Sequence, residues 1–228
     1  MYWQILFFTS FTCNMQITFQ ANINRQINPK YKTPRSKENT VAVLGSSKAT
    51  NDILNYMDMC ANSTKALVLS GKKLVHGCGS AGIMGEAYNS GYNYSSKNSM
   101  GLPEQNLAIL AEPLWGDEDT EHCIPIGCAK SEADRIEKFA QVANTILIFP
   151  GSAGTLQEAT TLISKNYYGK PEDKKKIILV GSEFFKGLIE QYNKLYQSQL
   201  IKYPPEELFS VADSEQEIIR LINKSCVN

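Results

Sequence analysis

From residue 41 onward, short unbroken apolar runs alternate with longer segments whose apolar positions recur every three or four residues. An unbroken short run is typical of a strand buried on both faces of a parallel sheet, and the longer spacing is typical of an amphipathic helix. The predicted strands cover residues 41–45, 73–77, 107–111, 122–126, 145–149, 175–181 and 208–213. The predicted helices cover residues 50–71, 78–91, 130–144, 155–169, 183–201 and 214–225.

The regular alternation of strand and helix, with short connections, predicts the class of fold. It indicates an α/β protein with a doubly wound, mostly parallel, Rossmann-like sheet and helices on both faces. One domain over residues 40–228 accounts for the whole pattern, because it contains no internal repeat. Gly71 and Gly91 are expected to end the helices that precede them. Pro125 confines its strand to an edge or a strand end, because proline cannot donate a ladder hydrogen bond.

The segment before residue 40 has a different character. It opens on "MYWQILFFTSFTCNM", an apolar run about as long as a signal-peptide core, but it lacks a basic n-region and a small-x-small cleavage site. The run is also too short to cross a membrane. Residues 20–40 are polar and contain two prolines, which is typical of a linker. We interpret residues 1–39 as a poorly ordered extension, with Met15 as another candidate start and a targeting role as the alternative.

Charge and cysteine content exclude some classes of protein. Lys+Arg and Asp+Glu are both 23, so no basic excess indicates binding to nucleic acid, and we expect no membrane partner either. The six cysteines are irregularly spaced without a C-x-x-C pair, so we expect reduced thiols in a cytoplasmic protein and no metal site. A zinc site or a Cys-His nucleophile is the unsupported alternative. The cysteines are Cys13, Cys60, Cys78, Cys123, Cys128 and Cys226.

Turns rich in small residues follow the predicted strands that end near residues 45, 77 and 149. In doubly wound sheets, ligands bind beyond the carboxyl ends of the strands, where the strand order reverses. The first turn carries Gly45 and Ser46, which fit either a ligand contact or an ordinary helix cap. The second, "GCGSAGIMG" (77–85), has G-x-G-x-x-G spacing before a helix. No carboxylate follows where it would hold the ribose of a dinucleotide, so we do not expect an NAD-type oxidoreductase.

The third turn precedes Thr155 and Glu158, which are spaced as a capping box. The box predicts Thr155 as the residue before the helix and Glu158 folded back on its first turn. Ser214 and Glu217 have the same spacing before the last predicted helix. A box does not explain four small residues in a row, which suit a backbone that wraps an anion at a helix N-terminus. Both interpretations of Glu158, a cap and a site residue, stay open. The small residues are Gly151, Ser152, Ala153 and Gly154.

These motifs together resemble the LOG ("lonely guy") family, whose members were often labelled lysine-decarboxylase-like. The family block P-G-G-x-G-T-x-x-E reads "PGSAGTLQE" at 150–158, and G-G-G-S-x-G-L-M-G reads "GCGSAGIMG" at 77–85. A strand ending in G-S-S reads "VLGSS" at 43–47, and the family arginine, fifteen residues before the proline, falls at Arg135. The resemblance extends from about residue 41 to about residue 200.

Many LOG proteins are cytokinin riboside 5′-monophosphate phosphoribohydrolases. The resemblance therefore implies hydrolysis of the N-glycosidic bond of a nucleoside 5′-monophosphate, giving a free base and ribose 5-phosphate, without a cofactor. It implies that Glu158 stabilises positive charge on the sugar or orders the attacking water, and that Arg135 binds the substrate or Glu158. It also implies a phosphate site and a nucleotide pocket. The phosphate site would comprise Gly151, Ser152, Ala153, Gly154 and Thr155, and the pocket Gly45, Ser46, Gly79 and Met84.

The sequence departs from the family pattern at several positions. Ser152 and Cys78 replace glycines, so each adds a Cβ that would crowd a positive-φ backbone or the ligand. "ADRI" (133–136) replaces the usual H-E-R-K, and without the family match Arg135 would be interpreted as part of a solvated helix face. No lysine is singled out as a Schiff-base partner, so a pyridoxal decarboxylase is not expected. The alternative function is a protein of this fold that binds a nucleotide or a phosphorylated cofactor without turnover.

Family members commonly pair through helices and complete each site across the interface. The resemblance therefore implies a homodimer. The long helix over residues 50–70 and the aromatic residues Tyr167 and Tyr168, expected to be exposed, are the candidates for this contact.

Overall fold

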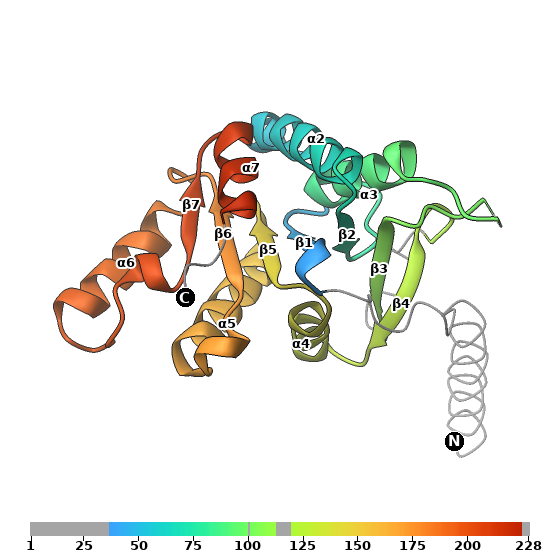
Figure 1. Ribbon diagram of the computed structural model, residues 1–228. Helices are drawn as coiled ribbons and strands as arrows, with labels where there is room; N and C mark the ends of the chain where they lie inside the picture. Colours follow the sequence, from blue (N-terminus) through green and yellow to red (C-terminus); the bar gives the residue numbers. More distant parts are fainter. Residues whose placement is uncertain (1–36, 100, 113–119, 225–228) are drawn as a thin grey trace, which may run out of the picture.

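A seven-stranded sheet forms the centre of the protein, with the strand order β4-β3-β2-β1-β5-β6-β7 (Figure 1). The computed structural model describes residues 37–99, 101–112 and 120–224, so most of the predicted extension lies outside the described residues. All neighbouring strands pair in parallel, which confirms the predicted α/β class. The strands are β1 (Thr40–Leu44), β2 (Lys73–His76), β3 (Asn106–Ala111), β4 (Ile124–Ala129), β5 (Thr145–Ile148), β6 (Lys176–Val180) and β7 (Ser210–Ala212).

Helices cover both faces of the sheet, with α2, α3 and α7 on one face and α4, α5 and α6 on the other (Figure 1). The helices are α2 (Leu54–Leu69), α3 (Gly82–Tyr94), α4 (Glu132–Val142), α5 (Ala153–Tyr168), α6 (Lys186–Gln197) and α7 (Glu215–Asn223). Short 3₁₀ helices lie at Lys37–Asn39, Asn51–Ile53, Pro171–Asp173 and Pro205–Glu207. No helix within the described ranges is long and apolar enough to cross a bilayer.

Burial on both faces explains why the strand sequences are continuously apolar. In β1, Val41 and Val43 belong to the core under α2, α3 and α7, whereas Ala42 and Leu44 belong to the core on the opposite face. A polar residue at any of these positions would be buried without water. Pro125 lies in β4, which is an edge strand, as predicted.

The ends of two helices follow their sequence signals. Gly71 follows α2 with φ of +86°, the left-handed conformation expected of a residue that ends a helix. Ser214 Oγ accepts a hydrogen bond from the Glu217 N–H at 3.2 Å. The Glu217 carboxylate in turn accepts from the N–H of Asp213 at 2.8 Å, one residue earlier than in a standard capping box. The predicted cap of the last helix is therefore confirmed.

Gly91 does not end its helix, because α3 continues past it to Tyr94. The residue is buried, and a Cβ placed on it would collide with the side chain of Asn106 on β3. The prediction of a helix end was wrong because a glycine that terminates a helix and one that makes room for a distant side chain look the same locally.

Replacing Gly91 with alanine should therefore destabilise the protein, although alanine favours helix more than glycine does. We expect a loss of about 2 kcal/mol, since overpacking a well-filled interior typically costs that much. Gly187→Ala is the matched control, because this glycine lies in α6 with nothing within 4 Å of the added Cβ. Urea unfolding of both variants tests the prediction, and a Gly91→Ala protein as stable as the wild type would contradict it.

The cysteines do not all remain thiols. Cys78, after β2, and Cys123, before β4, form a disulfide across a sequence separation of 45 residues, and neither Cys60 nor Cys128 takes part in this bridge. The expectation of reduced cysteines is therefore wrong for this pair. Spacing could not reveal the bridge, because the fold alone brings these segments together. Among the described residues there is no group of three or more side chains suited to holding a metal ion.

Candidate functional site

The turns after β1, β2 and β5 lie against one another at the carboxyl edge of the sheet. The Ser46 N–H donates a hydrogen bond to the Pro150 carbonyl at 3.0 Å, and the Met84 N–H donates to the Ser46 carbonyl at 3.2 Å. The strand order reverses between β1 and β5, which is where doubly wound sheets bind their ligands. The structure thus brings the predicted site residues of the three turns together.

Close packing against neighbouring side chains accounts for most of the glycines in these turns. A Cβ on Gly77 would lie 2.5 Å from Nη2 of Arg135, and one on Gly79 would lie 2.5 Å from Cε of Met84. A Cβ on Gly45 would likewise lie 2.7 Å from Cγ2 of Ile83. Gly154 is different, because it is exposed and a Cβ on it would come no closer than 3.9 Å to a neighbouring side chain, at Ser152 Oγ. Contacts within the chain therefore leave Gly154 open for the close approach of a ligand.

Helix α5 begins at Ala153, earlier than the sequence predicted. Ser152 is the residue before the helix, and its side chain makes no capping bond. Thr155 is therefore inside the first turn, buried, with its side chain against Gly151. The predicted capping box of Thr155 and Glu158 is wrong, because the four small residues let the helix start three positions earlier than the Thr-x-x-Glu pattern suggests. Glu158 is consequently not the carboxylate of this cap.

The two departures from glycine have different consequences for the backbone. Cys78 has φ of +58°, a left-handed conformation that favours glycine, so a side chain at this position is strained. Ser152 has φ of −85°, which any residue adopts, so the expected crowding of a positive-φ backbone does not occur there.

The N-terminus of α5 presents backbone donors to solvent. Ala153 and Gly154 are exposed, and the helical ladder starts with the Leu156 N–H donating to the Ser152 carbonyl at 3.2 Å. The first N–H groups of a helix have no partner within the helix, and they carry a partial positive charge. Helix α3 likewise lacks a side-chain cap, whereas α4 and α7 are capped by serine. An anion bound at the start of α5 would accept hydrogen bonds from these N–H groups.

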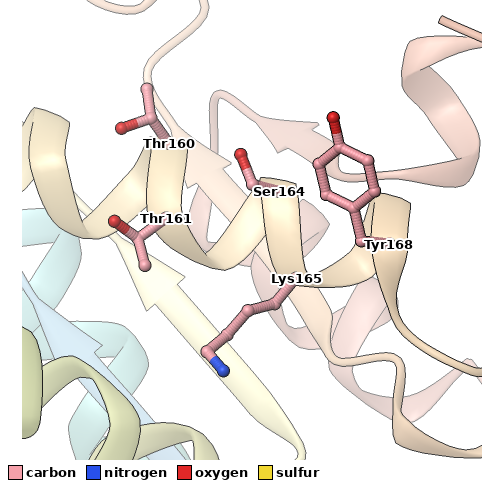
Figure 2. Close-up of a pocket in the computed structure, with 5 residues that line it drawn as sticks. All are labelled: Thr160, Thr161, Ser164, Lys165 and Tyr168. Carbon is pink, nitrogen blue, oxygen red and sulfur yellow. The ribbon is translucent and has the colours of Figure 1, made fainter.

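A surface hollow of about 390 Å³ lies on the later turns of α5, away from the three turns (Figure 2). None of the predicted site residues lines it. Lys165 at this hollow forms an ion pair with Glu137 of α4, 2.5 Å away. Tyr168 is exposed as predicted, but Tyr167 is half-buried against the core, so the expectation that Tyr167 is exposed is wrong. The lining residues are Thr160, Thr161, Ser164, Lys165 and Tyr168.

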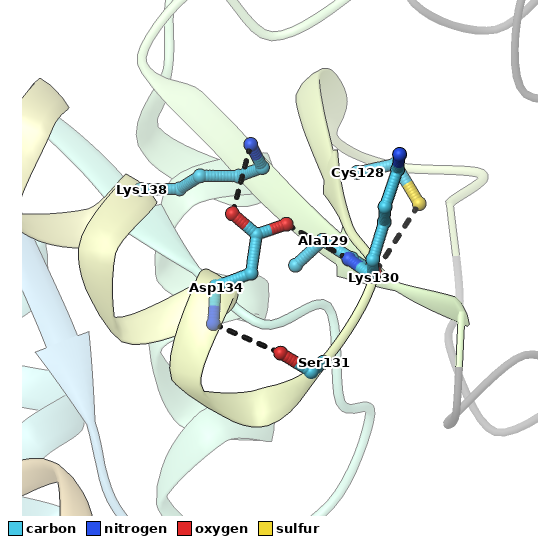
Figure 3. A network of polar contacts seen from close by, with 6 residues as sticks. All are labelled: Cys128, Ala129, Lys130, Ser131, Asp134 and Lys138. Carbon is cyan, nitrogen blue, oxygen red and sulfur yellow. Dashed lines mark hydrogen bonds and ion pairs between the residues drawn. The ribbon is translucent and has the colours of Figure 1, made fainter.

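The start of α4 is fixed by a compact polar network (Figure 3). Ser131 Oγ accepts from the Asp134 N–H at 3.2 Å, and an Asp134 carboxylate oxygen accepts from the Lys130 N–H at 2.9 Å. Lys138 lies 3.3 Å from the same carboxylate. The Lys130 N–H, followed by the charge of Lys138, holds the pKa of Asp134 below its ordinary value. Asp134 of the "ADRI" segment is therefore a capping residue that orients the next residue, Arg135.

Arg135 is buried, so the interpretation of a solvated helix face is wrong. Its Nη2 donates to the Gly77 carbonyl at 2.6 Å and to the Ile109 carbonyl at 2.9 Å, and its Nε donates to Ile109 at 3.1 Å. The guanidinium therefore ties α4 to β3 and to the turn after β2. It also acts on Glu158, whose pKa it lowers.

The surroundings of the Glu158 carboxyl favour its protonated form more than water does. Burial of its carboxyl raises its pKa to about 7, against the opposing effect of Arg135 and with the help of the negative charge of Glu132. The residue as a whole is nevertheless partly exposed, so it remains in contact with solvent. A carboxylate with this pKa, in the field of a buried cation, is suited to general base catalysis or to stabilising positive charge.

Sequence reasoning did not predict that Glu132 would act on Glu158. Its effect on Glu158 depends on the packing of α4 beside α5, which spacing alone does not reveal. Sequence reasoning also assigned no role in the site to His76 or Asn106, two buried residues that are hydrogen-bonded to each other.

Known proteins resemble this chain in sequence and in fold. A family model described as "Possible lysine decarboxylase" matches residues 84–222. The chain is similar to a rice (Oryza sativa subsp. japonica) protein described as "Probable cytokinin riboside 5'-monophosphate phosphoribohydrolase LOGL6", with 24% identity over 168 residues. The matched region is 72% of this chain and 63% of the rice protein, less than two thirds of that protein's length.

Solved structures show the same fold. The Moco carrier protein from Chlamydomonas reinhardtii aligns with a TM-score of 0.53 and 19% identity, over 80% of this chain and 94% of the carrier. The structural-genomics target TM1055 aligns with a TM-score of 0.55 and 16% identity, over 80% of this chain and 97% of that protein. At these identities the likeness establishes a shared fold and nothing more.

Proposed function

Because the chain belongs to the "Possible lysine decarboxylase" family, to which the LOG proteins also belong, we propose that it is a phosphoribohydrolase. Its substrate is a nucleoside 5′-monophosphate of the cytokinin riboside or AMP type, and its products are a free base and ribose 5-phosphate. The observation that carries the proposal is Glu158, a carboxyl with a pKa of about 7 on the helix whose exposed N-terminus follows the "PGSAG" turn.

The predicted residues divide into a phosphate site, a nucleotide pocket and the catalytic carboxyl Glu158, on which Arg135 acts through its charge. The 5′-phosphate binds at the N-terminus of α5, where backbone N–H groups and the helix dipole favour an anion. Water forms a bond to C1′ of the sugar as the bond from C1′ to the base nitrogen breaks, and the leaving base takes up a proton from solvent, which balances the proton that the water gives up. Glu158 accepts a proton from the water and its charge stabilises the oxocarbenium-like transition state. The phosphate site comprises Gly151, Ser152, Ala153, Gly154 and Thr155, and the nucleotide pocket Gly45, Ser46, Gly79 and Met84.

Incubation of the purified protein with AMP and with isopentenyladenosine monophosphate tests the proposed reaction. We expect chromatography to show a free base and ribose 5-phosphate in equal amounts. If no nucleoside monophosphate of any base releases its base, the hydrolase proposal fails.

A second candidate function is binding of a nucleotide or phosphorylated cofactor without turnover. The strained side chain at Cys78, in the turn beside the proposed pocket, favours it, because this residue departs from the family's glycine. The fold is also compatible with a carrier, since the Moco carrier protein shares it. A rise in melting temperature with nucleotides, without release of base, would support this candidate, and no rise with any phosphorylated ligand would exclude it.

We also propose that the protein is a homodimer, as the family resemblance implies. Tyr168, which is 84% exposed on α5, supports a contact through helices. Light scattering of the purified chain should give twice the mass of 25.4 kDa, and a monomer mass would contradict the proposal.

A further inference from the structure

Both nitrogens of His76 are engaged in hydrogen bonds, although the residue is fully buried. Nδ1 accepts a hydrogen bond from the backbone N–H of Cys78 at 3.0 Å, and Nε2 lies 2.7 Å from Oδ1 of Asn106. His76 is the last residue of β2, and Cys78 lies in the turn that follows. The ring therefore connects this turn to the neighbouring strand β3.

The partners of Asn106 determine which nitrogen of His76 carries the proton. Nδ2 of Asn106 donates to the carbonyls of Tyr88 at 3.1 Å and His122 at 2.7 Å, so Oδ1 is the acceptor that faces His76. Nε2 of His76 must then be the donor, which leaves Nδ1 as a lone pair directed at the Cys78 N–H. A charged ring is disfavoured, because a proton on Nδ1 would face the Cys78 N–H donor, and because burial, followed by the nearby charge of Arg135, lowers the pKa of His76.

The hydrogen bond to Nδ1 of His76 holds Cys78, a residue with a strained backbone. Cys78 has φ of +58°, and the residues on either side of it make the contacts that assemble the site. The Gly77 carbonyl accepts from Arg135, and Gly79 packs against Met84, whose N–H donates to Ser46. Displacement of the Cys78 backbone would therefore move both Arg135 and the proposed nucleotide pocket.

We propose that His76 is a positioning residue of the site. As the neutral Nε2–H tautomer, it holds the backbone of Cys78 in the left-handed conformation. It thereby keeps the turn over 77–85 in its ligand-binding conformation. The part of this inference that concerns ligand binding rests on the proposed function. The conformational part does not, because it concerns the turn itself.

Two substitutions separate the two hydrogen bonds of the ring. His76→Asn keeps an oxygen near the position of Nδ1, so it retains an acceptor for Cys78 but loses the bond to Asn106. His76→Gln keeps an amide nitrogen near the position of Nε2, so it retains the donor to Asn106 but leaves Cys78 without an acceptor. Both remove a buried ring, so we expect similar losses of stability in urea.

Hydrogen exchange of the 77–85 peptide distinguishes positioning from simple stabilisation. We expect His76→Gln to exchange at least about tenfold faster there than His76→Asn, and to bind AMP about tenfold more weakly. Equal exchange in the two variants would overturn the inference. If the wild type neither binds nor cleaves AMP or any other nucleoside monophosphate, the proposed function fails, whereas the exchange result still decides the role of His76.

Nuclear magnetic resonance of the wild-type ring provides a measurement that does not depend on the variants folding. In protein labelled with ¹⁵N-histidine, we expect one ring with the proton on Nε2 and a bare Nδ1 at about pH 6, where a free histidine is largely charged. A charged ring or the Nδ1–H tautomer for His76 at this pH would overturn the inference.

Discussion

Glu158→Gln should lower the rate of base release by about 10²–10⁴-fold, the usual contribution of general acid–base catalysis. An amide cannot accept the proton of the attacking water or stabilise positive charge on the sugar, although it has nearly the same shape as the carboxyl. Glu137→Gln is the matched control, because this carboxylate also faces α5 but forms an ion pair with Lys165 outside the three turns. Activity of Glu158→Gln within about threefold of the control would refute the assignment.

The pKa of Glu158 makes the same assignment testable through pH. As a base, the residue must be ionised, so kcat/KM of the wild type should rise through about pH 7 and then level off. Stability should change in the opposite direction. Between the unfolded value of 4.5 and the folded value of about 7, the folded protein binds more protons, so its stability falls as pH rises through this window.

Glu158→Gln removes this titration, so its melting temperature should increase relative to that of the wild type as pH rises from about 5 to about 8. A difference in melting temperature that does not change with pH would show that the carboxyl titrates normally.

Reduction of the Cys78–Cys123 disulfide should lower the free energy of unfolding by about 4 kcal/mol, the chain-entropy value for a loop closed over 45 residues. For a protein of this size, that loss lowers the melting temperature by roughly 10 °C. Thermal unfolding with and without a dithiol reductant measures it, and Cys123→Ser should reproduce the reduced state.

Cys128→Ser is the control for this experiment, because Cys128 lies on β4, close to Cys123 in the sequence, but takes no part in the Cys78–Cys123 bridge. It should melt close to the wild type and still respond to the reductant. Mass spectrometry of an unreduced digest should contain a peptide that links Cys78 to Cys123. Absence of this peptide, together with no effect of the reductant, would contradict the prediction.

The sequence was sufficient to predict the class of fold because local composition reflects burial on both faces of a parallel sheet. The strand at residues 145–149 is an example, since every residue of β5 is buried. The turns that form the candidate site could also be predicted, because parallel strands place their carboxyl ends at one edge. Pro125 marked the sheet edge for a local reason, its missing N–H.

Features that depend on distant contacts could not be predicted in this way. Burial of Arg135 depends on carbonyl acceptors at Gly77 and Ile109, which are remote in sequence. The same holds for Gly91, whose partner Asn106 lies on the next strand. The start of α5 was misassigned because the Thr-x-x-Glu pattern fits a cap at Thr155, whereas the small residues before it allow the helix to begin at Ala153.

The contact between Gly77 and Arg135 makes the effects of substitution at these two positions interdependent. The guanidinium occupies the space that a Cβ at position 77 would need, and it bonds to the carbonyl of that same glycine. Alanine at 77 is therefore harmful only while the arginine is present, and its cost largely disappears once a small residue replaces Arg135. In the evolution of this chain, the arginine constrains the glycine, so a lineage that loses Arg135 becomes free to lose Gly77 as well.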